Sequence, residues 1–172
     1  PVNEIDQWFS QLRSIWDLRL EALEKLMTKE PDMTELTLNV SRTIDATPEK
    51  LFNAWLDPEM LARFMLPGDG MSVPSATCDP VEGGRFDIVM RAGDQDMPHA
   101  GTYTKIDRHS RLVFTWESPF SVDDSMVTLD FTPVDAGTRV DLNHVKFPSE
   151  ESRDNHHGGW MAILAALETV AV

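Results

Sequence analysis

The stretch RFDIVMR at residues 85–91 decides the fold, because apolar and polar side chains alternate along it. Its apolar members, Phe86, Ile88 and Met90, are spaced two residues apart. Successive side chains of a strand point to opposite faces, so this spacing predicts a strand with one buried face. The same alternation recurs in the later stretches 112–117, 127–131 and 140–144. The middle of the chain is therefore predicted to be a run of strands.

Short turns separate these strands and indicate how they pair. Turn-forming residues stand at 93–94, 107–110 and 135–137. Consecutive strands joined by such short connections form an antiparallel sheet. Alternation at 36–41 predicts an earlier strand, and residues 67–74, which begin and end with proline and hold two glycines, are expected to be irregular.

Helices are predicted on either side of the run of strands. Thr47-Pro48-Glu49 and Asp57-Pro58-Glu59 each join an N-cap to a proline at the first helical position, so two short helices follow the first strand. A long helix is expected from about residue 150 to 170, with Ser149 as its N-cap. The whole pattern predicts an α+β fold, in which a curved antiparallel sheet of about six to seven strands wraps the C-terminal helix.

A further amphipathic helix is predicted over residues 3–29. Its apolar residues recur at steps of three and four, which places them on one face. They are Ile5, Phe9, Leu12, Trp16, Leu20, Leu23 and Met27. We expect two units, 1–31 as an N-terminal arm and 32–172 as the main domain. An exposed stripe of this size is rare on a monomer, so we expect the arm to form a homodimer through residues 3–29.

Composition restricts the partners and the location of the protein. The chain has 172 residues, with 15 Lys and Arg against 29 Asp and Glu, which gives a net charge of −14. Nucleic acid and anionic membrane surfaces both attract clustered basic residues, so neither is an expected partner. No run approaches the roughly 18 apolar residues that read as a membrane-spanning helix. With one cysteine and no recognisable signal peptide, the chain is expected to be cytoplasmic.

Several pieces of the chain in a fixed order resemble one family. They are Arg42 to Pro48, Trp55 to Glu59, Gly83 to Phe86, Asn143-His144 and His156 to Trp160. Together they make residues 36–170 resemble the START/SRPBCC helix-grip superfamily, and in it the heat-shock-protein-90 ATPase activator-like family. The resemblance implies a helix-grip fold and a small-molecule binder. Relatives often carry paired tryptophans where this chain has Phe64-Met65.

The N-terminal segment carries a separate resemblance. Trp8, Trp16 and residues 19–24 are similar to the closing helix of ArsR-type winged-helix regulators. This resemblance implies that the chain is the sensor half of a transcriptional regulator whose DNA-binding half would precede it.

A binding site is expected between the sheet and the C-terminal helix, in a cavity of a few hundred cubic ångströms. Its expected lining combines inward-facing aromatic and aliphatic side chains with two polar groups, His144 and Arg85, that orient the ligand. The lining residues are Phe86, Met90, Phe114, Trp116, Phe131, His144, Trp160, Leu164 and Arg85. The ligand class that such a lining favours is an apolar or aromatic small molecule.

Two alternatives to a binding site remain open from the sequence. His144 follows the inward alternation, which fits either a pocket histidine or a core histidine bonded to its surroundings. Gly158-Gly159 inside a helix indicates close approach to the sheet or to a ligand, or plain close packing. Cys78 is expected to be a small buried apolar residue.

No spaced catalytic or metal-binding motif is present in the sequence. His156 and His157 point about 100° apart on a helix, so they cannot chelate one metal ion together. We therefore expect no metal, no cofactor and no nucleophile–base pair. The rival functions are a co-chaperone-like interaction module and an enzyme of the polyketide cyclase type, which the same superfamily contains.

Overall fold

Strands dominate the chain, and helices stand before and after them. The computed structural model describes residues 8–13, 15 and 36–171. In chain order the elements are β1 (Thr37–Ile44), α2 (Pro48–Ala54), α3 (Pro58–Phe64), β2 (Met71–Cys78), β3 (Arg85–Ala92), β4 (Gln95–Asp107), β5 (Arg111–Thr115), β6 (Met126–Val134), β7 (Gly137–Val145) and α4 (Glu150–Ala171).

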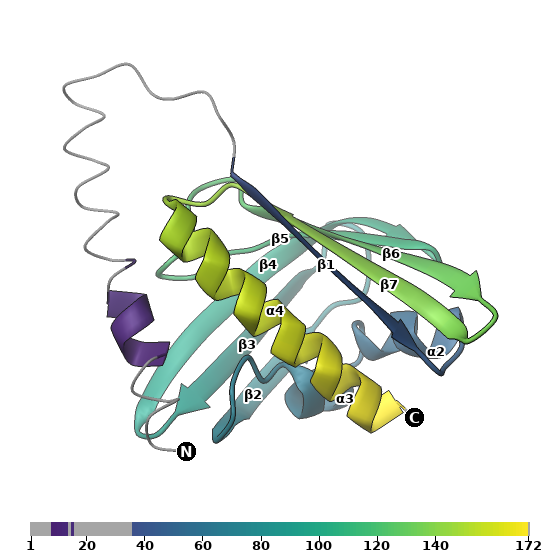
Figure 1. Cartoon of the computed structure of the whole chain (residues 1–172), viewed down its shortest axis with the longest axis horizontal. Helices are drawn as coiled ribbons and strands as arrows, with labels where there is room; N and C mark the ends of the chain where they lie inside the picture. The colour runs from purple at the N-terminus through teal and green to yellow at the C-terminus, as the bar shows by residue number, and fades with distance from the viewer. Residues whose placement is uncertain (1–7, 14, 16–35, 172) are drawn as a thin grey trace.

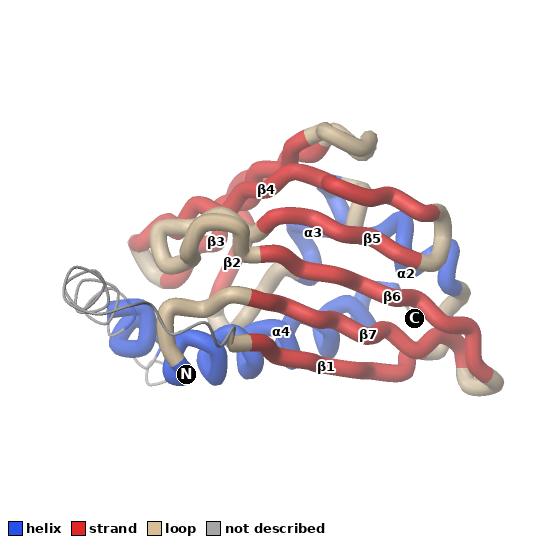
Figure 2. Tube along the Cα trace, turned by 90° about the horizontal axis from the view of Figure 1, so that it is seen from above, coloured by secondary structure: helices blue, strands red, loops and turns tan. Residues whose placement is uncertain are grey.

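The strands form one antiparallel sheet that curves around α4. The strand order is β1-β7-β6-β5-β4-β3-β2, so every neighbour except β1–β7 is also a neighbour in sequence. Figure 1 shows α4 running across the face of the sheet, with α2 and α3 beside its C-terminal end. Figure 2 shows the helices together on one side of the strands. The predicted α+β fold and its hairpins are confirmed.

Alternation along each strand produces the core, as β3 illustrates. Phe86, Ile88 and Met90 are each at most 3% exposed, while Arg85 and Asp87 between and beside them face solvent. The buried faces of the other strands and of α4 join them in a single hydrophobic cluster. Burial of these apolar faces is the main stabilising term of the fold.

The longest strand, β4, has 13 residues and pairs with both β3 and β5, so it links the two halves of the sheet. Its register against β5 shifts between Tyr103 and Lys105. At Gly101 a Cβ atom would lie 2.0 Å from the carbonyl oxygen of Thr115 and 2.5 Å from the ring of Phe86. Only glycine therefore allows this close approach, and such irregularities bend a strand.

The helices begin where the sequence predicts. The Oγ1 atom of Thr47 accepts the backbone N–H of Lys50 at 3.2 Å, and Oδ1 of Asp57 accepts that of Glu59 at 2.9 Å. Ser149 caps α4 in the same way, through Ser152 N–H at 3.1 Å. These bonds satisfy backbone donors that have no partner inside the helix.

The stretch expected to be irregular is the one element that the sequence assigned wrongly. Residues 71–78 form β2 at the edge of the sheet, and Pro74 lies inside it. The register against β3 shifts between Ser72 and Ser75, on either side of the proline. An edge strand pairs on one side only, so it tolerates a residue that lacks an N–H.

Part of the predicted N-terminal helix is described, and it packs on its own chain. Residues 8–13 and 15 are helical. Leu12 is 6% exposed and Ile15 is fully buried, and both join the main core, with Trp8 and Phe9 packed against it. The rest of residues 3–29 lies outside the described residues, so the dimer remains a prediction. No helix in the described part of the chain has the length and hydropathy to cross a membrane.

Candidate functional site

A void lies where α4, β3, β4 and the N-terminal segment meet. Its walls are aromatic and apolar side chains, with two histidines among them. The lining consists of Trp8, Leu12, Pro67, Met90, His99, Trp116, Phe120, His156, Gly159, Trp160 and Ile163. Its volume is about 30 Å³. One buried water needs roughly 10–15 Å³, so the void has room for about two.

A second void of about 10 Å³ lies deeper, against α3. Its walls are Trp55, Leu61, Met65, Phe86, Ile88, Tyr103 and Phe114. Here Phe86 and Phe114 pack edge to face with ring centroids 5.3 Å apart, an arrangement that fills space efficiently. The expected cavity of a few hundred cubic ångströms is therefore not found between the sheet and α4 among the described residues, although larger hollows of about 650 and 490 Å³ lie elsewhere, over Thr102 to Ser125 and beside Trp8 and Gly158. Large aromatic side chains fill the space between sheet and helix instead.

The structure divides the predicted lining among three places. Met90, Trp116 and Trp160 line the first void, and Phe86 and Phe114 line the second. The remaining apolar members, Phe131 and Leu164, are buried in the core but line neither void.

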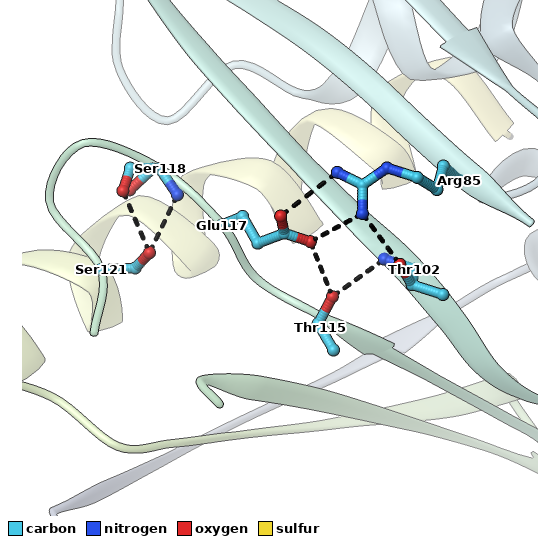
Figure 3. A network of polar contacts seen from close by, with 6 residues as sticks. All are labelled: Arg85, Thr102, Thr115, Glu117, Ser118 and Ser121. Carbon is cyan, nitrogen blue, oxygen red and sulfur yellow. Dashed lines mark hydrogen bonds and ion pairs between the residues drawn. The ribbon is translucent and has the colours of Figure 1, made fainter. Parts of the chain in front are cut away.

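Arg85 does not belong to the interior, and its predicted place in the pocket is wrong. It precedes Phe86 in β3, so its side chain points to the opposite, outer face of the sheet. There it forms an ion pair with Glu117, with Nη2 3.2 Å from Oε1, and donates to Thr102 at 3.0 Å (Figure 3). Hydrogen bonding to Arg85 lowers the pKa of the Glu117 carboxyl.

His144 is a fully buried histidine whose two nitrogens are both occupied. The Nε1–H of Trp160 donates to Nδ1 of His144 at 3.0 Å, and Oγ of Ser125 lies 2.6 Å from Nε2. An indole nitrogen can only donate, so Nδ1 must carry the lone pair and Nε2 the proton. Burial, followed by the nearby His156, lowers the pKa of His144 well below its usual value, so the ring is neutral.

Ser125 and His144 lie as close as a nucleophile and its base, but Nε2 of His144 carries a hydrogen and so cannot act as the base. We expected no serine or cysteine this close to a histidine inside the cavity, and the 2.6 Å contact lies outside it, because neither residue lines either void. Nε2 already carries a hydrogen and cannot accept one from the serine. The Ser125 hydroxyl instead donates to the carbonyl oxygen of Val145 at 3.2 Å. The result is a buried relay from Trp160 to Val145, which fits the core-histidine alternative.

Two further histidines, His99 and His156, line the first void, and sequence reasoning did not single them out for the site. Nδ1 of His99 lies 3.0 Å from the carbonyl oxygen of Met97, and Nδ1 of His156 lies 2.7 Å from that of Ser152. Each Nδ1 therefore donates its hydrogen, and each Nε2 keeps a lone pair. Burial lowers the pKa of His99 to about 4 and also lowers that of His156, so both rings are neutral at pH 7.

Two indole N–H groups at the same void have no acceptor among the described residues. They are Nε1 of Trp8 and Nε1 of Trp116, and both are buried. The ring of His99 lies 5.1 Å from that of Trp116, centroid to centroid. The void therefore has two buried donors without an acceptor among the described residues, and two histidines whose Nε2 can accept a hydrogen bond, on walls that are otherwise apolar. Buried polar groups without a partner are uncommon and indicate that something else supplies it.

Gly159 shapes one wall of this void. A Cβ atom at Gly159 would lie 3.3 Å from Cβ of Pro67 and 3.8 Å from the ring of Trp8, whereas one at Gly158 would meet nothing within 4 Å. The close approach expected of this glycine pair is thus made by Gly159 alone. It is made to Pro67 and Trp8, not to the sheet.

Cys78 carries no sign of reactivity. It is half-buried, and its Sγ donates to the carbonyl oxygen of Leu56 at 3.1 Å. Burial raises the pKa of the thiol, which keeps it protonated. Among the described residues no three His, Cys, Asp or Glu side chains are arranged to hold a metal ion.

Comparison with known proteins shows the family of the main domain. The model of the family described as Activator of Hsp90 ATPase homolog 1-like protein matches residues 45–171. The chain belongs to this family. The resemblance seen in the sequence is thereby confirmed for the domain, while the ArsR-like resemblance lies outside the matched range and remains a prediction.

Solved structures agree with this family and fold. A protein of Chromobacterium violaceum is 24% identical with a TM-score of 0.69, and covers 78% of this chain and 96% of its own. One of Nitrosomonas europaea is 20% identical with a TM-score of 0.68, covering 78% and 93%. An Aeromonas hydrophila protein is 24% identical with a TM-score of 0.68, covering 78% and 90%. No curated protein matches the chain. At these identities the matches show a shared fold.

The family model begins after the N-terminal segment, and this affects the site. Trp8 and Leu12 line the first void but precede residue 45. Phe64 and Met65, at the end of α3, are at most 2% exposed, and Met65 lines the second void. The side chains of the chain itself therefore line both voids.

Proposed function

We propose that the protein binds an apolar or aromatic small molecule between the sheet and α4, at the void beside Trp160 and Met90. The observation that carries this proposal is a pair of buried indole N–H groups at that void, those of Trp8 and Trp116, which have no acceptor among the described residues. His99 and His156 line the same void, and each has an Nε2 that can accept a hydrogen bond because its Nδ1 donates to a backbone carbonyl. Apolar walls with a few convergent polar groups are typical of ligand sites. The family fold supports the same proposal.

The ligand must enlarge the void to enter. Drug-sized ligands occupy roughly 300–1,000 Å³, and the void has about 30 Å³. Met90 has a flexible side chain that can repack, and the N-terminal segment forms one wall. A role as the sensor half of a regulator fits this arrangement, because the segment that resembles a regulator helix forms part of the wall of the site. We further propose a cytoplasmic location and a homodimer through residues 3–29.

A pair of glycine variants tests the binding site. Protein purified from its source is analysed by native mass spectrometry, as wild type and as Gly159→Leu and Gly158→Leu. Leucine at 159 fills the void, while leucine at 158 projects into open space. We expect a bound small molecule in the wild type and in Gly158→Leu, and its loss in Gly159→Leu. Absence of any bound molecule from the wild type, or equal retention by both variants, would refute the proposal.

A second candidate function is proton transfer on the bound molecule, as in a polyketide cyclase. The supporting observation is that His99 and His156 line the same void and each has Nδ1 held by a backbone carbonyl, which leaves Nε2 as the basic nitrogen of the ring. A neutral imidazole held in this way can act as a general base. The test is deuterium exchange at the methyl group of acetophenone, followed by NMR. Exchange above background that is lost in His99→Gln would support the enzyme, and background exchange in the wild type would exclude this role for this class of substrate.

A co-chaperone-like surface is less well supported. On the outer face of the sheet, Arg85, Arg91 and Arg111 are each paired with a carboxylate, of Glu117, Asp96 and Asp130 respectively. Paired charges of both signs do not create a patch of one sign that would attract an oppositely charged partner.

A further inference from the structure

The indole of Trp8 occupies the mouth of the proposed binding site. Trp8 lines the void together with Gly159 and Trp160 of α4. Because Gly159 has no side chain, the surface of α4 is flat there, and a Cβ atom would lie 3.8 Å from both Cη2 and Cζ3 of the indole. A planar aromatic ring therefore packs against helix backbone that carries no side chain. The flat surface at this point of α4 fits a planar ring.

The rest of the described N-terminal segment anchors that ring. Leu12 lines the same void and is 6% exposed, and Ile15 is fully buried in the main core. In Figure 1 the described helical part lies beside the sheet, and its Trp8 and Leu12 line the void together with residues of β3, β4 and α4. Trp8 and Leu12 thus fill space between the sheet and α4 that residues of the family domain leave open.

The fit of the indole is apolar only. Its buried Nε1–H has no acceptor among the described residues, although His99 and His156, whose Nε2 atoms can accept a hydrogen bond, line the same void. An unpartnered buried donor weakens the docked state relative to one that is satisfied. A molecule that takes the place of the indole could make the same apolar contacts. If its N–H or O–H also reached either histidine, it would add the hydrogen bond that Trp8 lacks.

We propose that Trp8 is a displaceable occupant of the site, and that a neutral planar aromatic molecule bearing one N–H or O–H donor binds by replacing its indole. The donor of that molecule would bond to Nε2 of His99 or His156. This inference rests on the proposed function and adds the ligand class and a mode of regulation. Ligand binding and docking of the segment around Trp8 exclude one another.

The exclusion has a measurable consequence. A site that is occupied by its own chain most of the time binds an external ligand with an affinity reduced by the unoccupied fraction. Removing the internal occupant therefore raises the affinity. By reciprocity the ligand releases residues 8–15 from the domain.

Calorimetric titration with indole tests the proposal. The proteins compared are the full-length wild type, Trp8→Ala and Phe9→Ala. Phe9 is the matched control, since it is an aromatic residue of the same segment that packs on the core without lining the void. We expect Trp8→Ala to bind indole at least tenfold more tightly than the wild type, and Phe9→Ala to match the wild type. In Trp8→Ala, adding His99→Phe should reverse most of the gain.

Equal affinities of the wild type and Trp8→Ala would overturn the proposal while leaving the binding function in place. Absence of indole binding by every variant would overturn it as well, and the native mass spectra would then decide the binding function separately. If circular dichroism shows that Trp8→Ala is unfolded, Trp8→Leu provides the same comparison with a smaller loss of packing.

A second measurement uses the wild type. With 5-fluorotryptophan in place of tryptophan, the fluorine resonance of Trp8 is assigned through Trp8→Phe. Titration with indole should move it to the position of an exposed tryptophan. A Trp8 resonance that stays in place while indole binds would show that the ligand does not displace it.

Discussion

At the scale of single residues, the positions of a few hydrogen atoms determine what the histidines can do. His144 receives the indole N–H of Trp160 on Nδ1, so its Nε2–H must donate to Ser125. His99 and His156 have the opposite tautomer, because each Nδ1–H donates to a backbone carbonyl. The first histidine is therefore a structural link, and only the other two can accept a hydrogen bond from a ligand.

Two adjacent glycines in α4 give the first prediction. Gly159→Leu should lower the free energy of unfolding by about 1–3 kcal/mol, because the added side chain meets Pro67 and Trp8. Gly158→Ala should raise it by up to about 1 kcal/mol, because alanine favours the helix and the added methyl group meets nothing. Urea unfolding of both variants checks this. A Gly159→Leu variant as stable as the wild type would show that Trp8 and Pro67 do not pack on this glycine.

The sequence allowed some site residues to be predicted and hid others. Alternation correctly placed Met90 inward, and the same alternation excludes Arg85, which adjoins the inward-facing Phe86. His99 follows the same inward alternation in β4, so a signal for it was present. The contact between Trp8 and Gly159 joins residues far apart in the chain. No local pattern predicts such a contact.

At the scale of the elements, helix starts could be predicted from local sequence, whereas the place of a strand in the sheet could not. Caps at Thr47, Asp57 and Ser149 marked the helix starts, because capping involves residues only two or three positions apart. Strand β2 was missed because Pro74 normally argues against a strand. Its tolerance depends on lying at the sheet edge, which is a property of the whole sheet. The size of the interior void likewise depends on how aromatic rings from several elements interlock.

The N-terminal segment gives the second prediction. We expect light scattering of the full chain to give twice the 19.4 kDa mass of one chain. Leu20→Asp places a charge on the predicted apolar stripe and should convert the dimer to a monomer that keeps its thermal stability. Leu12→Asp should instead destabilise the domain, because Leu12 is buried in the core of its own chain. A monomeric wild type would contradict the dimer.

At the scale of the whole molecule, the N-terminal segment, the sheet and α4 share one hydrophobic core. Leu12 and Ile15 belong to the same cluster as Met90 and Trp160. The candidate site lies inside this cluster, so its two uncharged histidines couple the site to the stability of the whole fold. That coupling makes stability depend on pH in a direction that the histidine environments determine.

The last prediction is a loss of stability in mild acid. Burial lowers the pKa of His99 from 6.5 to about 4, and it also lowers those of His144 and His156. Between pH 6.5 and about pH 4, His99 is protonated in the unfolded chain but not in the folded chain. The free energy of unfolding therefore falls as the pH drops below 6.5 and stops falling, for His99, below about 4. A shift of this size corresponds to about 3 kcal/mol for that one group.

The measurement is urea unfolding at intervals from pH 7.5 to pH 4 for the wild type, His99→Gln and the exposed control His157→Gln. Carboxylates such as Glu117, whose pKa Arg85 lowers, also lose stabilising interactions in acid, but they do so in all three proteins and cancel in the comparison. The slope of stability against pH should become shallower in His99→Gln and remain unchanged in His157→Gln. Because the folded chain excludes the proton from His99, a ligand that donates a hydrogen bond to its Nε2 should lower its pKa further, so that the fall in stability continues to a lower pH. Equal slopes in all three proteins would show that His99 is not held neutral by burial, and the acceptor assigned to the site would then be wrong.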